Sequence, residues 1–546
     1  MSEVLRIIPL GGAGEIGKNM TVVEYGAHAL VIDCGLMFPE SDMLGIDLVI
    51  PDISYLMEAP ERVKAIFLTH GHEDHIGGLP YIVPQLPVPL YATRLTRGLI
   101  EVKLREAGLL SQTQLHTITP GQPVAIGPFV VHPFHVCHSI PDSVGLGVET
   151  PLGLVIHTGD FKFDYTPVDG RLTDFGALAD FGRKGVLALL SDSTNAEQPG
   201  YTPSERVVSQ EFARVFEQAP GRVIVSTFAS NISRIQQVIE CAIRYQRRVA
   251  VVGRSMVENV RMARSLGFLS APDGLFVRPE EMERLPPAEV VIVCTGTQGE
   301  PTSALVRMAN QEHRQVSIQP GDTVILSATP IPGNEELVHR TLDNLFKLGA
   351  KVYYPRLRPV HVSGHASQEE QKMMLSLTRP RYFIPISGEY RHLVLHGELA
   401  KELGIPDEHV FVVRNGQVIE IDTQGARLGE RVAGGHVLVD GAGVGDVGEV
   451  VLRDRQMLSR DGFVVVVLAR DAETGEVVEG PELVSRGFVF MRDAEALMEE
   501  AKDVVLKVAR SGHRDTLSTS IHDRLAEFLY ARTRRRPMIF PVVLDV

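Results

Sequence analysis

Cysteine is scarce in this chain: only four of its 546 residues are cysteines, and they are scattered along the sequence. They are Cys34, Cys137, Cys241 and Cys294, and most of them lie in apolar, strand-like segments. This spacing is not that of a disulfide framework, and free buried thiols are typical of proteins in a reducing compartment. We therefore expect four small buried side chains and a cytoplasmic protein.

Long hydrophobic runs and an excess of positive charge are also missing. The apolar stretches have the length of β-strands, far below the ~20 residues that cross a membrane, so we expect no membrane partner. The formal net charge is −14, which argues against a protein that coats nucleic acid indiscriminately but leaves room for a local basic groove. The chain is 44% hydrophobic and 22% charged, a globular composition with length for roughly two to four domains.

The most informative segment is T-H-G-H-E-D-H at residues 69–75, which follows the pattern of a buried strand. His70 and His72 are two positions apart and can face one metal ion, while Asp74 and His75 can face a second. Imidazole nitrogen and carboxylate oxygen suit zinc or manganese. We favour a binuclear metal site over a polar loop that happens to be rich in histidine.

A glycine motif at residues 12–17 has the form G-x-G-x-x-G, and Asp33 lies at the distance expected of a ribose-binding acid. A dinucleotide site needs a helix directly after the glycines. Here residues 21–25 and 29–33 have the pattern of a β-hairpin instead. We therefore expect the glycines to form a tight loop near the metal site, and Asp33 to orient a ligand histidine or the metal loop.

Two further candidate ligands stand at predicted strand ends. His138 follows a strand at residues 130–134, and Asp160 follows one at residues 154–156. With the first motif, this order of histidines and aspartates resembles the metallo-β-lactamase fold, an α/β fold with a four-layer αββα sandwich. The resemblance implies one ion on His70, His72 and His138 and another on Asp74 and His75, with Asp160 bridging the two.

The resemblance also implies two zinc ions, with manganese as an alternative or activating metal. Ions ~3.5–4 Å apart activate water and stabilise both oxygens of an in-line displacement. We expect a hydroxide between them to be the nucleophile and Asp74 and Asp160 to be catalytic. This chemistry suits phosphodiesters, lactones, thioesters and β-lactams alike, so other parts of the chain must decide the substrate.

Strands and helices alternate between about residues 204 and 355, which predicts a parallel, doubly wound α/β sheet. Strands are expected at residues 223–226, 248–252, 290–294 and 323–326. This insertion follows S-D-S-T-N at residues 191–195 and resembles the β-CASP domain of nucleic-acid-processing relatives. In that reading Asp192 is an acid near the metal site.

The segment H-V-S-G-H-A-S at residues 361–367 matches a later histidine motif of the same group. A turn of small residues can present backbone N–H groups and a hydroxyl to a phosphate. We expect this loop to bind RNA and one of its histidines to give a proton to the leaving oxygen, in place of the alternative of a polar surface loop. The expected phosphate-binding residues are His361, Val362, Ser363, Gly364 and His365, and the proton donor is His365.

One departure concerns the second ion. The group commonly has a histidine just before Gly-Glu, but Ser387 stands there in this chain. A serine hydroxyl is a poor zinc ligand, so we predict that His392, five residues later, binds the ion. The alternative is a position filled by water or RNA. The resemblance also implies a structural calcium near Leu44 and Ile46 with the carboxylate of Asp440, although Asp440 could be a plain turn residue.

From about Pro9 to residues 534–541 near its end, the chain resembles bacterial ribonuclease J. The domains expected on this basis are residues 1–205 and 356–430 for the two parts of the metallo-β-lactamase domain, 206–355 for the β-CASP domain, 431–455 for a linker and 456–546 for a small α/β C-terminal domain.

The resemblance implies a metal-dependent ribonuclease of rRNA processing and mRNA decay, with 5′-to-3′ exonuclease activity on 5′-monophosphate RNA and some endonuclease activity. Its expected partners are single-stranded RNA, further copies of itself in a homodimer or homotetramer, and other RNA-decay proteins. Two alternatives are a small-molecule metallo-hydrolase and a non-catalytic RNA-binding subunit. The latter should show eroded ligands, which this chain does not.

Overall fold

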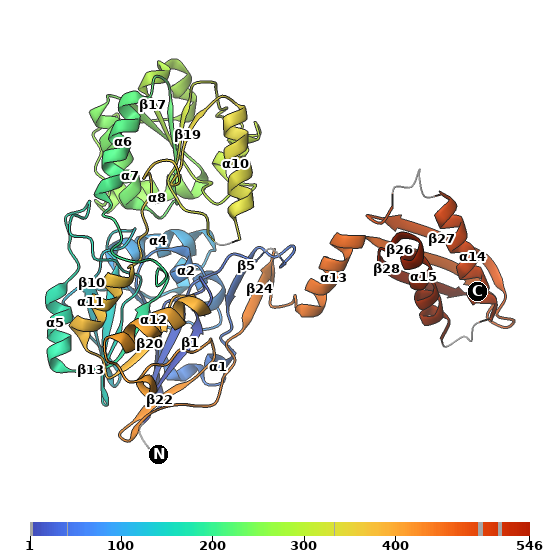
Figure 1. Ribbon diagram of the computed structural model, residues 1–546, viewed down its shortest axis with the longest axis horizontal. Helices are drawn as coiled ribbons and strands as arrows, with labels where there is room; N and C mark the ends of the chain where they lie inside the picture. The colour runs from blue at the N-terminus through green and yellow to red at the C-terminus, as the bar shows by residue number, and fades with distance from the viewer. Residues whose placement is uncertain (1–3, 41, 332, 490–494, 512–515) are drawn as a thin grey trace. The chain divides into compact units, whose positions relative to one another are not determined.

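The computed structural model describes residues 4–40, 42–331, 333–489, 495–511 and 516–546 (Figure 1). It divides into two units. The first comprises Met1–Phe38 and Leu48–Val437, and the second comprises Pro39–Asp47 and Leu438–Val546.

Two sheets form the base of the first unit. The 8-stranded sheet has the order β23-β22-β1-β3-β4-β6-β7-β8. Its strands are β1 (Leu5–Gly11), β3 (Met20–Tyr25), β4 (His28–Ile32), β6 (Val63–Leu68), β7 (Leu90–Ala92), β8 (Leu115–Thr117), β22 (Ile419–Asp422) and β23 (Gly425–Leu428). The 6-stranded sheet has the order β20-β13-β12-β11-β10-β9. Its strands are β9 (Val124–Ile126), β10 (Phe129–His135), β11 (Val144–Thr150), β12 (Gly153–His157), β13 (Val186–Asp192) and β20 (Tyr382–Ile386).

Apolar side chains from the facing surfaces of these sheets form one core. Val23 and Phe67 of the first sheet belong to the same buried cluster as Val131 and Val155 of the second. Strands expose alternate residues to opposite faces, so the outward-facing residues need a second cover. Helices supply it, and the result is the predicted αββα sandwich.

Different helices cover the two outer faces. The 8-stranded sheet packs against α3 (Leu79–Ile82) and α4 (Arg94–Glu106), and the 6-stranded sheet packs against α5 (Phe175–Lys184), α11 (Gln368–Thr378) and α12 (Tyr390–Glu402). Shorter elements complete the unit: β2 (Ala13–Gly14), β5 (Leu48–Pro51), α1 (Ser54–Met57), α2 (Glu73–Ile76), β21 (Gly388–Glu389) and the 3-10 helices at Pro60–Arg62, Leu110–Gln112, Pro279–Arg284, Pro287–Glu289 and Asp407–His409.

The inserted segment forms a third sheet of order β16-β15-β17-β14-β18-β19 with parallel pairing throughout. Its strands are β14 (Val223–Ser226), β15 (Arg248–Val252), β16 (Phe276–Val277), β17 (Val290–Cys294), β18 (Thr323–Leu326) and β19 (Lys351–Tyr353). One face packs against α6 (Arg206–Gln218), α7 (Ile232–Arg244) and α8 (Arg254–Ser265), and the other against α9 (Ala304–Ala309) and α10 (Glu335–Lys347). The doubly wound parallel sheet is therefore confirmed.

The hairpin that argued against a dinucleotide site is also confirmed. β3 and β4 pair antiparallel, with Tyr25 opposite His28. The residues between the glycine motif and β3 contain no helix. The motif therefore lacks the helix that a pyrophosphate site requires.

The second unit has its own sheet of order β27-β26-β28, made of β26 (Phe463–Arg470), β27 (Val477–Arg486) and β28 (Met538–Asp545). Helices α14 (Glu495–Ser511) and α15 (Leu517–Thr533) cover one face. The predicted linker region contains β24 (His436–Asp440), β25 (Gly443–Val444) and the start of α13 (Glu449–Asp461). In the part of the chain that the structure describes, no helix is both long and apolar enough to cross a membrane.

Candidate metal centre and phosphate-binding loop

The histidine-rich segment leaves the sheet at the end of β6 and enters α2, with His72 at the helix N-cap. The backbone N–H of Thr69 donates to Asp33 Oδ1 over 2.8 Å, and the Thr69 hydroxyl donates to Asp33 Oδ2 over 2.9 Å. Asp33 thus fixes the turn from which the histidines project. This is one of the roles that the sequence suggested for Asp33.

Three imidazole nitrogens converge beside this turn. His72 Nδ1 lies 3.1 Å from His70 Nε2 and 3.1 Å from His138 Nε2. Burial, followed by the nearby histidines, lowers the pKa of His70 and His138 well below the ordinary value, and burial lowers that of His72 to about 4. Neutral rings that point lone pairs at one another repel unless a cation lies among them. These three nitrogens therefore fit a zinc ion.

The opposite ring nitrogens are held by hydrogen bonds that fix the tautomers. His138 Nδ1–H donates to the carbonyl of Gly364 over 2.8 Å. His70 Nδ1 lies 3.1 Å from the Thr69 hydroxyl, and His72 Nε2 lies 3.3 Å from the Ser139 hydroxyl. Such partners orient metal ligands and strengthen their binding. Gly364 links the phosphate-binding loop directly to a metal ligand.

His75 is oriented in the same way for a second ion. Its Nδ1–H donates to Asp33 Oδ2 over 2.8 Å, so Nε2 is the nitrogen that remains for a metal ion. Burial lowers the pKa of His75, but the nearby carboxylates outweigh it and raise that pKa well above the ordinary value. His75 Nε2 lies 3.1 Å from Asp160 Oδ2 and 3.5 Å from Asp74 Oδ2. Burial tends to raise the pKa of Asp74, but the neighbouring His75 and His72 hold it below the ordinary value. Asp74 is therefore ionised and offers a carboxylate oxygen to a metal ion.

Asp160 lies between the two groups of ligands. Its Oδ2 is 3.1 Å from His75 Nε2 and 3.7 Å from His70 Nε2, and 3.9 Å from His138 Nε2. Its Oδ1 is buried without a hydrogen-bond partner among the described residues. A buried carboxylate oxygen left unpaired is costly unless a cation satisfies it. Asp160 thus fits the bridging position that the family resemblance implied.

His365 stands on the open side of this cluster, and its ring is 24% exposed. Its Nδ1–H donates to Asp192 Oδ2 over 2.8 Å and lies 3.9 Å from Asp160 Oδ2. Burial would lower the pKa of His365, but the carboxylates of Asp192 and Asp160 outweigh it and raise the pKa to about 9. These two carboxylates therefore favour the protonated form of His365.

The candidate phosphate-binding loop, residues 361–367, is held by side chains that were not predicted from the sequence. Asn195 Nδ2 donates to the hydroxyl of Ser363 over 2.9 Å and to the carbonyl of His365 over 3.0 Å. Thr202 donates to that carbonyl over 2.6 Å, and Lys162 Nζ donates to the carbonyl of Ser363 over 3.1 Å. Asn195 ends the S-D-S-T-N segment, which was the available signal. Lys162 and Thr202 had none.

Two other predicted loop residues face inward. Val362 is buried, so only its backbone can contact a ligand. His361 Nδ1 is buried without a hydrogen-bond partner among the described residues. Burial, and then the nearby Arg234, lower the pKa of His361 to about 3, so it is neutral.

His392 is not brought to the metal ligands. Its Nδ1 accepts a hydrogen bond from the backbone N–H of Glu389 over 3.3 Å, and its Nε2 lies 3.5 Å from Glu197 Oε2. The groups of ligand atoms found in the described residues involve His70, His72, His75, His138, Asp160 and His365. This geometry does not favour His392 as a ligand.

The predicted calcium ligands are engaged by an arginine. Arg455 donates to the carbonyl of Leu44 over 3.0 Å and to Asp440 Oδ2 over 2.5 Å. The side chain of Ile46 is buried and apolar. Calcium needs six to eight oxygens, and a guanidinium already occupies the two nearest candidates. These residues do not fit a calcium ion.

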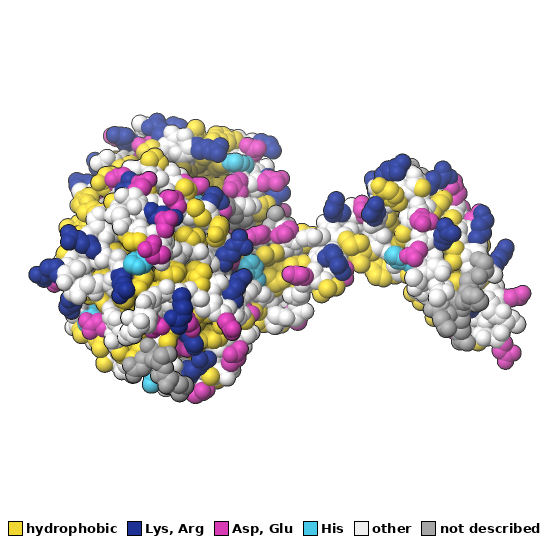
Figure 2. Space-filling model, turned by 60° about the horizontal axis from the view of Figure 1, so that its bottom comes forward, with side chains coloured by type: hydrophobic (Ala, Val, Ile, Leu, Met, Phe, Trp, Pro, Cys, Tyr) yellow, Lys and Arg dark blue, Asp and Glu magenta, His cyan; other side chains and the backbone are white. Residues whose placement is uncertain are grey.

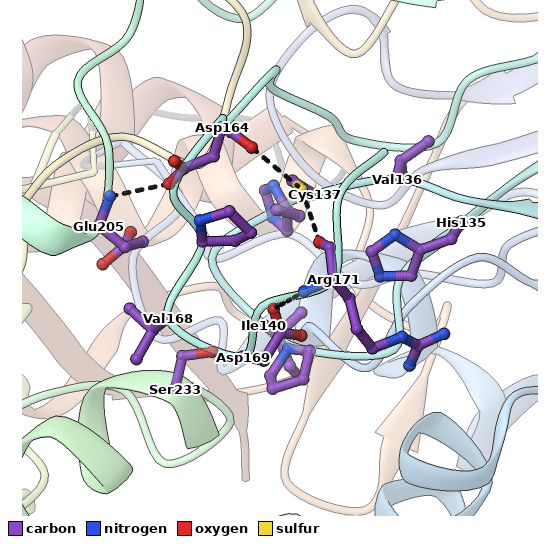
Figure 3. A pocket seen from close by; sticks show the side chains of 13 residues that line it. His135, Val136, Cys137, Ile140, Asp164, Val168, Asp169, Arg171, Glu205 and Ser233 are labelled. Carbon is purple, nitrogen blue, oxygen red and sulfur yellow. Dashed lines mark hydrogen bonds between the residues drawn. The ribbon is translucent and has the colours of Figure 1, made fainter. Parts of the chain in front are cut away.

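A pocket borders the centre on the side of residues 135–138 (Figure 3). Within it, Asp164 accepts the N–H of Glu205 over 2.9 Å, and the Cys137 thiol points to the carbonyl of Arg171 at 3.3 Å. Burial raises the pKa of Cys137. A protonated thiol that is hydrogen-bonded to backbone is structural. Cys137 thus helps to fix the backbone next to His138.

Comparisons with known proteins agree with this geometry. Family models match along the chain: "Metallo-beta-lactamase superfamily" at residues 13–195, "Ribonuclease J, beta-CASP domain" at 220–345, "Zn-dependent metallo-hydrolase RNA specificity domain" at 354–413 and "Ribonuclease J C-terminal domain" at 450–546.

Curated relatives match almost the full length. Ribonuclease J2 of Bacillus subtilis is 46% identical over 100% of this chain and 99% of its own. Ribonuclease J of Thermus thermophilus is 45% identical over 99% and 95%, respectively. A solved structure of a protein of unknown function from Enterococcus faecalis has a TM-score of 0.55 at 17% identity, covering 76% of this chain and 100% of that one, and shares the fold alone.

Proposed function

The chain belongs to the ribonuclease J family of metal-dependent ribonucleases, and on that basis we propose that it degrades RNA from the 5′ end. The favoured substrate is single-stranded RNA with a 5′-monophosphate, and the products are nucleoside 5′-monophosphates. Some internal cleavage accompanies this activity. The proposed cellular roles are rRNA processing and mRNA decay.

The observation that carries the proposal is the joining of the phosphate-binding loop to the metal centre. The carbonyl of Gly364 holds His138, and His365 lies 3.9 Å from Asp160. A 5′ phosphate bound at Ser363 would therefore lie next to the bond to be cleaved. That arrangement supports removal of nucleotides one at a time from a 5′ end.

Two divalent ions held by this centre, zinc with manganese as an alternative, would supply an activated water and stabilise negative charge on the phosphate. His70, His72 and His138 would hold one of them, and Asp74 and His75 the other. Asp160 would contact both. The second position has carboxylate oxygens beside a single imidazole, and such donors suit manganese better than an all-histidine set does.

His365 is the proposed proton donor to the leaving oxygen. Asp192 accepts from its Nδ1, which leaves Nε2–H available to substrate. A general acid must carry its proton at the working pH and lie within hydrogen-bond reach of the leaving atom. The hydrogen bond to Asp192, which favours the protonated form of His365, supports the first condition, and its exposed ring edge supports the second.

RNA is proposed to be gripped locally. Figure 2 shows basic and acidic side chains interspersed over the face that it draws. With a formal net charge of −14, a general positive coat would not hold RNA. The loop and the metal ions must therefore supply much of the attraction to phosphate.

The test is incubation of one RNA carrying a 5′-monophosphate, 5′-triphosphate or 5′-hydroxyl with the purified chain, with product lengths followed over time. A hydroxyl end leaves pocket donors unpaired, at about 1–3 kcal/mol for each buried donor. A triphosphate adds bulk and charge. Monophosphate RNA should be shortened fastest. Equal rates for all three ends would contradict the proposal.

We also propose that the chain forms a homodimer or homotetramer in the cytoplasm and associates with other RNA-decay proteins. Three apolar side chains on the sheet of the second unit, Val484, Phe540 and Val542, are at least 40% exposed. Exposed apolar patches of this kind commonly mark interfaces. The four cysteines are free and buried, which supports a reducing compartment. Sedimentation equilibrium would reveal the stoichiometry, and a monomer at micromolar concentration would contradict it.

A further inference from the structure

The side chain of Asn19 lies among the atoms that would bind the second ion. Its Nδ2 is 3.0 Å from His75 Nε2 and 3.3 Å from Asp74 Oδ2, and it donates to the backbone carbonyl of Asp74 over 3.1 Å. Asn19 is only 8% exposed. It follows the glycine motif, which is part of neither the predicted metal centre nor the phosphate-binding loop.

The glycine motif is shaped around this asparagine. Gly12 has a φ of +79°, and a Cβ at Gly12 would lie 2.1 Å from Asn19 Oδ1. The backbone of Asn19 is fixed as well: its N–H donates to the carbonyl of Asp74 over 2.9 Å, and its carbonyl accepts from the N–H of Gly35 over 3.0 Å. The loop therefore delivers one polar side chain to the metal-binding segment and leaves no room for it to move away.

One ligand position of the second ion is not filled by a histidine, and Asn19 lies next to that position. Ser387 stands where the family resemblance implied a histidine, and His392 is engaged by Glu389 and Glu197. The hydroxyl of Ser387 donates to Asn19 Oδ1 over 3.3 Å. β2 pairs with β21, which follows Ser387, so the glycine loop and the serine are held together. The serine thus meets the asparagine instead of the ion.

We propose that Asn19 is a ligand of the second ion through its side-chain oxygen, with Ser387 as its supporting partner. The proposal rests on the two-ion function above. Nδ2 now points toward His75 and Asp74, and a half-turn of the amide exchanges its oxygen and nitrogen. The half-turn gives up the hydrogen bond from Nδ2 to the Asp74 carbonyl, which still accepts the backbone N–H of Asn19. The oxygen then faces the ion, and the NH₂ group faces the Ser387 hydroxyl. Because a hydroxyl can donate or accept, Ser387 satisfies both orientations.

The resulting ligand set differs from that of the first ion. The second position has one imidazole, from His75, and three oxygens, from Asp74, Asp160 and Asn19. The first has three imidazoles and one carboxylate. Oxygen donors favour manganese and imidazoles favour zinc. The centre should therefore bind the two metals at different positions when both are supplied.

The decisive experiment compares Asn19→Ala with Asn19→Asp in the full chain. Mn²⁺ binding to protein whose first position is loaded with zinc is measured by titration calorimetry and electron paramagnetic resonance. Loss of the ligand in Asn19→Ala should weaken the second ion by at least roughly 10–100-fold, the range known for supporting partners of metal ligands. Asn19→Asp keeps an oxygen ligand and adds charge, so it should bind Mn²⁺ at least as tightly as the unaltered chain.

Asn19→Asp separates ligation from a merely structural role. If Asn19 acted only as a hydrogen-bond donor to Asp74 and His75, a carboxylate there would repel Asp74 and weaken the ion as much as alanine does. Weak binding by both variants would therefore overturn the proposal. So would unchanged binding by Asn19→Ala.

Asn415→Ala is the matched control. Asn415 Oδ1 accepts the N–H of Ala13 over 3.0 Å, so it supports the same loop. This variant should keep Mn²⁺ affinity near that of the unaltered chain, whereas a loss equal to that of Asn19→Ala would show that only the loop's shape matters.

A second background tests the missing ligand directly. Ser387→His should restore Mn²⁺ binding to Asn19→Ala by supplying an imidazole, and failure to restore it would count against a shared ligand position. Failure of the two-ion function itself would appear differently, as an unaltered chain that binds only one ion or none.

Discussion

At the scale of single residues, the metal centre depends on which ring nitrogen of each histidine carries a lone pair. His72 presents Nδ1, whereas His70 and His138 present Nε2. His72→Ala or Asp74→Ala should abolish nearly all RNA cleavage, because the activated water depends on the ions. Cleavage of a labelled RNA under controlled metal concentrations measures this, with circular dichroism to confirm folding. Near-normal rates in either variant would refute the ligand assignment.

Gly364 provides a test of how the loop supports the centre. A Cβ at this position would lie 2.7 Å from two atoms of the His138 ring and 2.8 Å from the backbone nitrogen of Ser139. Gly364→Ala should therefore displace His138 and weaken the first ion by about 10–100-fold, as loss of an orienting partner does. Zinc affinity measured with a competing chelator gives the readout. Gly448→Ala is a suitable control, since a Cβ there meets no atom within 4 Å and its φ is −110°.

His392 gives a contrasting case. The sequence predicted that His392→Ala would weaken one ion, but both ring nitrogens face other groups. We now expect this variant to lose much less affinity than His75→Ala, as measured by the metal content of dialysed protein. Equal losses would restore His392 as a ligand.

The sequence could predict which candidate ligands the structure brings together, but not the residues that hold them. The H-x-H-x-D-H pattern is local and has few alternative explanations. The Gly364 carbonyl and the Asn19 amide reach the centre from segments far away in sequence, and no spacing rule connects them. The serine in place of the implied histidine indicated an open ligand position. The ring nitrogens of His392, the nearby histidine in sequence, face Glu389 and Glu197 in the structure.

At the scale of elements, a buried network of charges positions the phosphate-binding loop. Glu205 pairs with Arg234 at 2.6 Å and with Lys162 at 3.4 Å. Arg234 donates to the carbonyl of Val360, and Lys162 donates to that of Ser363. The start of the loop is thereby tied to α7 through Arg234, and its middle is tied through Lys162 to the segment that follows β12.

This network predicts a pH-dependent contribution to stability. Burial tends to raise the pKa of Glu205, but Arg234 and Lys162 outweigh it and lower the pKa below the ordinary value of 4.5. Its stabilisation should be complete above pH 4.5 and should be lost as the pH falls through the lower, folded-state pKa.

Glu205→Gln should cost about 3–5 kcal/mol near pH 7, because two buried cations lose their partner. Urea unfolding at several pH values measures the cost. The difference from the unaltered chain should shrink below pH 4.5. A constant difference across that range would contradict the role of the carboxylate.

Elements with short apolar runs bounded by glycine or proline were predictable from sequence. β14, β15, β17 and β18 have the expected bounds. β27 could not be predicted from an apolar run, because outward polar residues alternate with a few buried ones. Its pairing with β26 depends on tertiary contacts. The strands at residues 436–444 were hidden by glycines that suggested a linker.

At the scale of the whole molecule, the chain combines a metallo-hydrolase domain, a candidate phosphate-binding loop and the β-CASP insertion of the ribonuclease J family. Fold class and family could be predicted because the ligand order and the loop motif occur together along one chain. The exposed sheet face of the second unit could not be predicted, because its exposure depends on which face the helices cover. We propose that one loop both selects the 5′ end of the RNA and supports cleavage at the metal centre.

The most direct test measures the ratio of cleavage rates for 5′-monophosphate and 5′-triphosphate RNA, using 5′-labelled substrates, for Ser363→Ala and His365→Ala. Ser363→Ala should keep cleavage but lose the preference for monophosphate, because the pocket donor is removed. His365→Ala should lose the preference and the rate together. In the unaltered chain, labelled mononucleotide should be the first product. A ladder that shortens from the 3′ end, or equal degradation of triphosphate RNA by the unaltered chain, would contradict the account.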